Sequence, residues 1–167
     1  MLLLALLKQT STDSVLIFTR TKHRAERLAQ QISREGYKVT SLHSNRSQGQ
    51  RQSALKGFKG GAYQIMVATD IAARGLDVDS ISHVINYDMP DTADAYIHRI
   101  GRTGRAERTG DAFTLVTSED NIMIKTLEKI MAQQLPRQKL AGFDYAAQAP
   151  AKPANTTAHT HRKPPVV

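Results

Sequence analysis

The fold is decided by the stretch between residues 15 and 42, which reads VLIFTRTKHRAERLAQQISREGYKVTSL. Its apolar run at residues 15–18 predicts a buried strand. Residues 22–35 predict a helix, because their apolar positions recur at i, i+3, i+4 and i+7. Thr21 suits the start of this helix and Gly36 its end. Residues 38–42 predict the next strand, so the stretch forms a strand–helix–strand unit.

The same alternation continues along the chain. Further strands are expected at residues 64–69, 83–87 and 112–116. Ser47 and Gln50 form a capping box for a helix that ends at residues 60–61, and later helices are expected at residues 91–100 and 121–134. Apolar, non-alternating strands between helices indicate an α/β fold, with a parallel sheet covered by helices on both faces. Ligands of such sheets bind at the carboxyl ends of the strands, here the segments after Phe18, Leu42 and Ala68.

The 167 residues fit one domain, expected at residues 1–147, and a tail at residues 148–167. No acidic residue follows Asp144, and four of the six prolines lie in the tail. The tail is therefore expected to be disordered, Pro-rich and mildly basic. His159 and His161 are interpreted as solvated tail residues, and no metal site is expected.

Composition limits the functional classes. The absence of cysteine excludes disulfides, a thiolate nucleophile and Cys-ligated zinc, and it agrees with a cytoplasmic location. The net charge of +8 favours a polyanionic partner without naming it. Residues 1–7 are apolar but too short to span a membrane, so they predict a buried first helix. The start within an apolar run leads us to expect that another segment precedes it.

The stretch YIHRIGRTGR at residues 96–105 combines arginines with glycines. Like charges are costly to gather unless an anion neutralises them, and guanidinium groups fit phosphate in a bidentate way. Arg102 and Arg105 lie three positions apart, so a helical turn would point both the same way. The alternative interpretation is a solvated basic surface.

The stretch ATDIAARGLD at residues 68–77 directly follows a predicted strand. Thr69 and Asp70 are therefore expected at the carboxyl edge of the sheet, where their oxygens can bond sugar hydroxyls or backbone amides. A structural role for Asp70, as a cap of the turn behind it, is an equally open interpretation.

Both stretches resemble motifs of the DEAD-box helicases, a branch of superfamily 2. HRIGRTGR at residues 98–105 fits the motif VI pattern HRxGRxGR, and ATDIAARGLD fits the motif V pattern ATDxxxRGxD. LIFTRT at residues 16–21 resembles motif IV, and QGQR at residues 48–51 resembles the QxxR motif. The resemblance covers residues 13–135. FTRTKH at residues 18–23 and LPR at residues 135–137 are most similar to the bacterial RhlE-type subgroup.

The resemblance implies a RecA-like domain, similar to P-loop NTPases, that forms the C-terminal half of an ATP-dependent RNA helicase. Arg102 and Arg105 are then arginine fingers for the γ-phosphate of ATP, and Asp77 bonds the ribose. Arg74 and His98 are implied to link the two domains when they close.

The sequence contains no GxxxxGK[ST] loop, Asp-Glu-Ala-Asp or Ser-Ala-Thr. The resemblance therefore implies that the N-terminal RecA-like domain holds most of the ATP and its Mg²⁺, and that this chain alone is inactive.

RNA is the partner implied by the resemblance, with Thr21, Arg51 and Thr69 holding successive phosphates of one strand without reading bases. No membrane partner is expected. One alternative is a non-catalytic RNA-binding or adaptor module with the same fold, against which the intact arginine pair argues. Another is a DNA-directed superfamily 2 enzyme, which RNA or DNA stimulation of ATP hydrolysis would separate. His98 distinguishes the DEAD-box resemblance from the related DEAH branch, which has Gln at this position.

Overall fold

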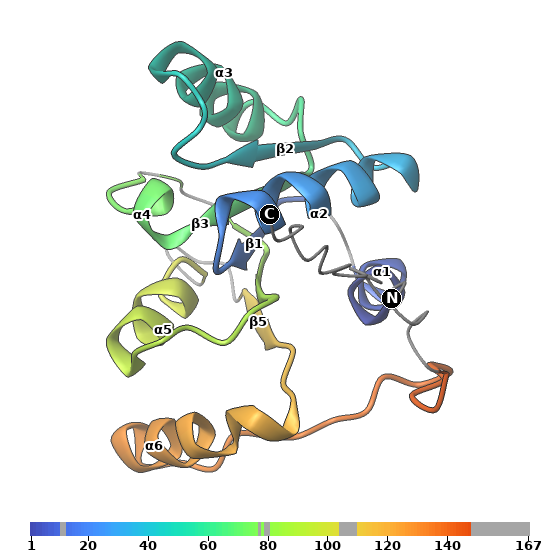
Figure 1. Cartoon of the computed structure of the whole chain (residues 1–167), viewed down its shortest axis with the longest axis vertical. Coiled ribbons are helices and arrows are strands. Elements are labelled where there is room, and N and C mark those ends of the chain that lie inside the picture. The colour runs from blue at the N-terminus through green and yellow to red at the C-terminus, as the bar shows by residue number, and fades with distance from the viewer. Residues whose placement is uncertain (11–12, 77, 79–80, 104–109, 148–167) are drawn as a thin grey trace, which may run out of the picture.

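Five parallel strands form one sheet in the order β2-β3-β1-β4-β5 (Figure 1). The computed structural model describes residues 1–10, 13–76, 78, 81–103 and 110–147. The strands are β1 (Val15–Thr19), β2 (Val39–Leu42), β3 (Ile65–Thr69), β4 (His83–Asn86) and β5 (Asp111–Thr114). The expected parallel sheet is thus confirmed.

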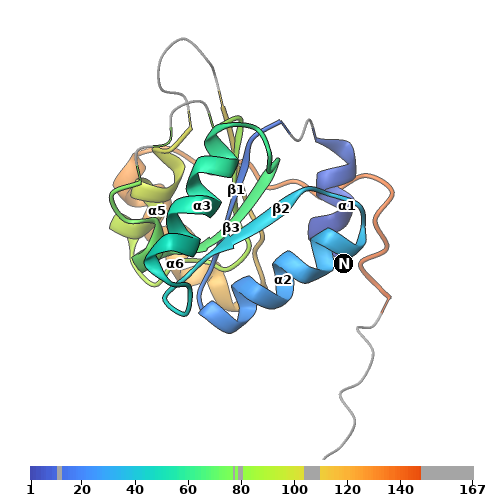
Figure 2. The same ribbon diagram turned by 90° about the horizontal axis from the view of Figure 1, so that it is seen from above.

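Helices cover both faces of this sheet, as the view from above shows (Figure 2). They are α1 (Leu2–Gln9), α2 (Lys22–Arg34), α3 (Gln48–Lys59), α4 (Asp70–Ala73), α5 (Ala93–Ile100) and α6 (Asn121–Met131), with a 3₁₀ turn η1 (Ser118–Asp120). Helices α1 and α2 pack on one face through Leu3, Leu28 and Ile32. On the other face, α3 and α4 pack through Phe58 and Ala72.

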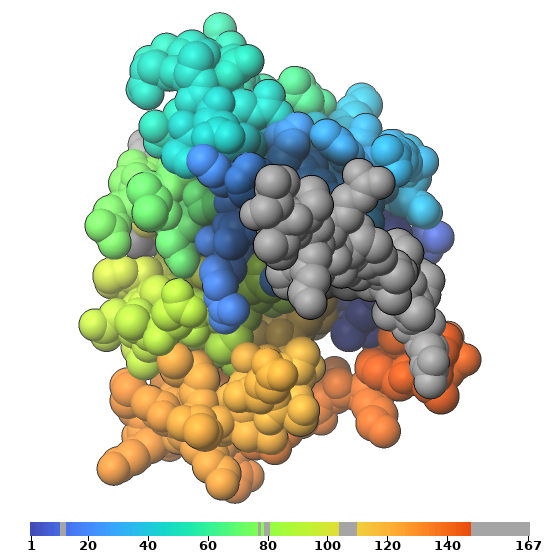
Figure 3. Space-filling view, viewed as in Figure 1, coloured from blue at the N-terminus to red at the C-terminus, as the bar shows by residue number. Residues whose placement is uncertain are grey.

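The alternating side chains of each strand are divided between these two cores. Val15 and Ile17 of β1 face α1 and α2, whereas Leu16 and Phe18 face α3 and α4. All five residues of β1 are buried, which explains why its sequence is continuously apolar up to Thr19. A third cluster joins α5 to α6 through Tyr96 and Leu127, and α6 lies at the opposite end of the molecule from α3 (Figure 3).

Local signals position the helix ends as predicted. The Thr21 side chain accepts a hydrogen bond from the Arg24 amide at the start of α2. Gly36, just beyond the end of α2, has a φ of 91°, a conformation that favours glycine. Ser47 and Gln50 form the expected capping box of α3. The Thr92 side chain accepts a hydrogen bond from the Ala95 amide and caps the start of α5.

Some predicted boundaries were wrong. The fifth strand ends at Thr114, and Val116 beyond it is 48% exposed. Helix α6 ends at Met131 because Ala132 turns into the left-handed conformation, with a φ of 52°. Helix α4 appears where only a short turn was expected. The tail at residues 148–167 lies outside the described residues, and none of the described helices is long and apolar enough to cross a membrane.

Candidate functional site

The centre of the site is the ion pair between Arg99, which is buried, and Asp70, whose side chain is 40% exposed. Arg99 of α5 is only 3% exposed, and its Nε and Nη2 donate to the two carboxylate oxygens of Asp70 at 2.6 and 2.5 Å. Its Nη1 donates to Oδ1 of Asn86 and to the carbonyl of Asp88. The guanidinium also lies 5.0 Å from the ring centroid of Phe18. This arrangement fixes α4 and α5 against the carboxyl ends of β1, β3 and β4.

Asp70 therefore has a structural role, which was one of its two open interpretations. It fulfils this role by binding Arg99 and not by capping a turn. It is the first residue of α4 rather than its cap, and its carboxylate binds the Arg99 guanidinium instead of a backbone amide. Arg99 thus also has a structural role. Gly75, which follows α4, has a φ of 75° and permits a tight turn there.

Beside this ion pair, a small pocket opens between α4 and α5. Arg74, His98 and Arg102 all line it, together with Asp70 and Arg99. Arg74 and His98 are exposed and Arg102 is half-buried. The structure thus brings the two predicted interdomain residues and one predicted finger to the same surface.

Arg102 is held by the chain itself, since its Nη1 donates to the carbonyl of Leu76 at 2.6 Å. The sequence pattern did not predict this structural contact of Arg102. A guanidinium has five N–H donors, and those not used on Leu76 can still bind an anion. The bond also links Arg102 of motif VI to Leu76, the residue that precedes Asp77 in motif V.

Helix α5 ends at Ile100, and the amides of Arg102 and Thr103 donate to the carbonyls of Arg99 and Ile100 in the turn that follows. That a helical turn points Arg102 and Arg105 the same way stays a prediction. Asp77 and Arg105 lie outside the described residues, so their assigned contacts with ATP stay predictions.

The predicted RNA residues lie along the carboxyl ends of β1, β2 and β3. Thr19 and Thr69 are partners in the parallel register, which places Thr21 and Thr69 at neighbouring strand ends. The Thr21 hydroxyl accepts the Arg24 amide and keeps its own proton to donate. The Thr69 hydroxyl makes no hydrogen bond to any described residue. Both can therefore donate to phosphate oxygens.

Arg51 lies in the first turns of α3, where its amide donates to the carbonyl of Ser47. Its half-buried side chain has no ion-pair partner among the described residues. The segment before α3 is joined to the start of α2, because Nζ of Lys22 donates to Oδ1 of Asn45 at 2.8 Å. The starts of α2 and α3 thus form one continuous polar edge.

Residues 1–107 match the family model described as the helicase conserved C-terminal domain. The chain belongs to this family. It is similar to Escherichia coli DEAD-box protein SrmB, whose crystal structure with regulator of ribonuclease activity A aligns with a TM-score of 0.81 and 35% identity, over 90% of this chain and 89% of that one. The RecA-like fold of a DEAD-box helicase C-terminal domain is thereby confirmed.

Curated relatives agree with this assignment. DEAD-box ATP-dependent RNA helicase CshA of Bacillus subtilis is 40% identical over 86% of this chain and 29% of its own length. ATP-dependent rRNA helicase RRP3 of Candida glabrata is 44% identical over 83% of this chain and 28% of its own. The helicase C-terminal domain thus spans less than a third of the relatives it matches.

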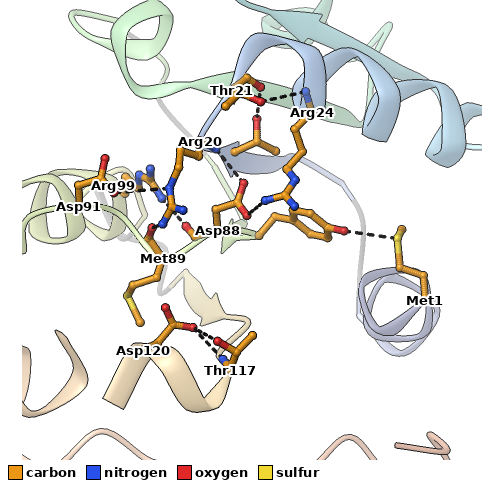
Figure 4. Close-up of polar contacts among 12 residues, drawn as sticks. Met1, Arg20, Thr21, Arg24, Asp88, Met89, Asp91, Arg99, Thr117 and Asp120 are labelled. Atoms are coloured by element: carbon orange, nitrogen blue, oxygen red, sulfur yellow. Dashed lines mark hydrogen bonds and ion pairs between the residues drawn. The ribbon is translucent and has the colours of Figure 1, made fainter. Parts of the chain in front are cut away.

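Sequence reasoning missed several residues that hold the site of this helicase domain. Asn86 and Asp88 bind Arg99, and Asp88 also accepts the Arg20 amide and pairs with Arg24 (Figure 4). Both lie at the end of a predicted strand, so their position at the carboxyl edge was a usable signal. Their partners are remote in sequence, which is why the contacts themselves were not predictable.

A second missed cluster supports the loop between β2 and α3. Oε2 of Glu26 accepts hydrogen bonds from Ser41 and Arg46 and lies 3.0 Å from Nε2 of His43. His43 is 5% exposed and Ser41 2% exposed. Because the carboxylate can only accept, Nε2 of His43 carries a proton in this pair. The cluster anchors the segment that leads into Ser47 and the helix of Arg51.

This cluster makes the domain's stability depend on pH. The His43 hydrogen bond, helped by Ser41 and Arg46, lowers the pKa of Glu26 from its ordinary 4.5 to about 2. A lowered pKa stabilises the fold above the ordinary value, and this contribution is lost as the pH falls from about 4.5 through 2. Glu26 is partly exposed, so we expect Glu26→Gln to cost on the order of 1 kcal/mol at pH 6 and much less at pH 2.

The measurement is urea unfolding at several pH values. Glu119→Gln is the control, because Glu119 is exposed and has no ion-pair partner among the described residues. An equal loss of stability at pH 6 and pH 2 would contradict the role assigned to the carboxylate charge.

Proposed function

We propose that this chain is the second RecA-like domain of an ATP-dependent DEAD-box RNA helicase of the RhlE type. In this proposal it acts with an N-terminal RecA-like domain that cradles ATP. Its curated relatives are RNA helicases by name, and FTRTKH at residues 18–23 with LPR at residues 135–137 supports the narrower subgroup.

The observation that carries the proposal is the pocket between α4 and α5, where Arg74, His98 and Arg102 converge. Arg74 and His98 are exposed and so accessible to a second domain. Arg102 is oriented by Leu76, so less of its mobility is lost when a phosphate binds. A preformed donor of this kind is suited to charge that develops on the γ-phosphate.

The mechanism that we propose is gated by closure of the two domains. ATP and a single RNA strand bind across the cleft, and closure brings Arg102 and Arg105 to the γ-phosphate. Thr21, Arg51 and Thr69 hold the strand by its phosphates in a bent path that a duplex cannot follow, so a short duplex is separated locally. Hydrolysis removes the γ-phosphate contact and lets the cleft reopen.

Mg²⁺ would neutralise phosphate charge in this reaction. Arginine side chains fit phosphate oxygens and not a cation. Among the described residues, no three His, Asp or Glu side chains are grouped as metal ligands. We therefore assign the ion mainly to the ATP-cradling domain.

Arg51→Ala tests the RNA surface in the chain itself. We expect weaker binding to single-stranded RNA, and a slope of log K against log salt that is smaller by about 0.7, because one phosphate contact is lost. Lys56→Ala is the matched control, since Lys56 is an exposed cation in the last turn of the same helix. Fluorescence anisotropy at a series of salt concentrations measures both quantities.

An unchanged salt slope in Arg51→Ala would mean that Arg51 does not contact the RNA and that the strand binds at another surface.

A DNA strand of the same sequence separates an RNA enzyme from a DNA-directed one, because the ribose 2′-hydroxyl contributes only in RNA. Equal affinity for both strands would contradict an RNA-specific path.

A further inference from the structure

A second polar groove lies along α2, on the other side of β1 from the α4–α5 pocket. We call it the α2 groove and define it by the residues that line it and carry donors or an aromatic ring, namely Thr21, His23, Arg24, Arg27, Gln31 and Tyr87. Figure 4 shows Thr21 at the start of α2 and Arg24 reaching from that helix toward Asp88. The mechanism described above uses Thr21 alone of these residues.

The α2 groove carries positive charge that the fold does not neutralise. Arg24 is paired with Asp88, and its guanidinium lies 5.8 Å from the ring centroid of Tyr87. His23 and Arg27 are exposed and have no ion-pair partner among the described residues. Apart from Asp88, which is paired with Arg24, no carboxylate is found at the groove among the described residues that line it. Such a surface attracts an anion.

The spacing of the donors fits an extended anion. Arg24, Arg27 and Gln31 lie at i, i+3 and i+7 and so follow one side of α2. From Thr21 to Gln31 the helix rises about 15 Å, at 1.5 Å per residue. A nucleic acid strand in a duplex carries one phosphate per about 3.4 Å of axis, so this length accommodates more than one phosphate.

The topology places the α2 groove where α/β sheets bind ligands. Strands β1 and β4 are neighbours, and the chain leaves β1 toward β2 on one side but leaves β4 toward β5 on the other. Ligands bind outside the carboxyl ends of strands at such a divergence. Thr21 follows β1 and Tyr87 follows β4, with the Tyr87 amide bonded to the Phe18 carbonyl.

We infer that the α2 groove binds the sugar–phosphate backbone of an RNA strand beyond Thr21, lengthening the path formed by Thr21, Arg51 and Thr69. The inference rests on the proposed RNA function, because Thr21 belongs to both surfaces. Arg27 and Gln31 contact the added phosphates, whereas Arg24 is held by Asp88 and shapes the wall.

The test compares oligouridylates of about 6 and about 12 nucleotides, within the range of known single-strand sites. Binding to the chain is measured by anisotropy at several salt concentrations for Arg27→Ala, Arg27→Lys, Arg34→Ala and Arg51→Ala. Arg34 is the matched control, because it is exposed, lies on the same helix, and lines no part of the groove. Thermal unfolding verifies that each variant remains folded.

For the longer strand, we expect Arg27→Ala to bind several-fold more weakly, with a salt slope smaller by about 0.7, and Arg27→Lys to restore most of the affinity. For the shorter strand, Arg27→Ala should match Arg34→Ala. Arg51→Ala should weaken the binding of both strands.

If Arg27→Ala matches Arg34→Ala at both lengths while Arg51→Ala weakens binding, the inference that the α2 groove binds RNA is overturned and the proposed function stands. If Arg51→Ala has no effect and Arg27→Ala weakens both strands, RNA binds at the α2 groove without the proposed path, and both the path and its extension are overturned.

Discussion

Replacing Arg102 or Arg105 by alanine is expected to lower kcat of RNA-stimulated ATP hydrolysis far more than it lowers ATP affinity. The experiment uses the proposed two-domain enzyme, in which this chain is joined to an N-terminal ATP-cradling domain. An arginine finger acts on charge that is greatest in the transition state, so its loss appears in kcat. Removing the finger from other NTPases costs about 10³–10⁵ in rate. We expect less for either single change, since two arginines share one phosphate.

Two further variants sharpen this prediction. Arg102→Lys keeps the charge but loses the planar fork and its geometry, so it should rescue only part of the rate. The double alanine variant should be non-additive, because both side chains act on the same group. Steady-state turnover with saturating RNA and separate ATP binding measure these effects. Arg34→Ala is the control for loss of an exposed cation. A kcat near wild type in both single variants would remove the fingers from the mechanism.

The second large effect is on stability. Asp70→Ala should lower the free energy of unfolding by about 3 kcal/mol, because it leaves a guanidinium that is only 3% exposed without its carboxylate. Arg99 keeps Asn86 and the Asp88 carbonyl as acceptors, but neither is charged. Such a loss is a large part of the stability of an ordinary domain.

The matched control is Glu35→Ala, which removes the acid of an exposed pair with Lys8, at 3.4 Å. Surface pairs contribute about 0–1 kcal/mol, so this variant should unfold close to wild type. Urea denaturation followed by circular dichroism measures both variants. Equal midpoints for the two would show that the Asp70–Arg99 pair does not hold α4 and α5 in place.

Local signals made most of the fold predictable. The side chains of Thr21 and Ser47 and the backbone freedom of Gly36 act within four residues, so each helix end could be placed from its own neighbourhood. The order β2-β3-β1-β4-β5 could not be predicted in the same way. All the central strands are short apolar runs, and nothing in such a run specifies its neighbour.

The site was also predictable only in part: its motif residues could be found from the sequence, but the contacts between remote residues could not. Arg74, His98 and Arg102 were singled out from motifs, and the structure brings them to one pocket. The pairing of Asp70 with Arg99 spans 29 positions and depends on how α5 returns to the sheet. The contact of Glu26 with His43 depends in the same way on how α2 lies beside β2. Only the assembled sheet reveals which polar residues are fully used by the fold and which remain for a ligand.

In the proposed mechanism, Arg102 and Arg105 act on ATP whereas Arg51 acts on RNA. The most direct measurement is turnover of the two-domain enzyme across RNA concentrations, with RNA affinity determined separately. We expect the Arg102→Ala/Arg105→Ala double variant to bind RNA nearly as wild type but to hydrolyse ATP very slowly even at saturating RNA. Arg51→Ala should need more RNA yet approach the wild-type kcat. If instead the double variant loses RNA binding and keeps its kcat, the arginines are RNA ligands and the mechanism is wrong.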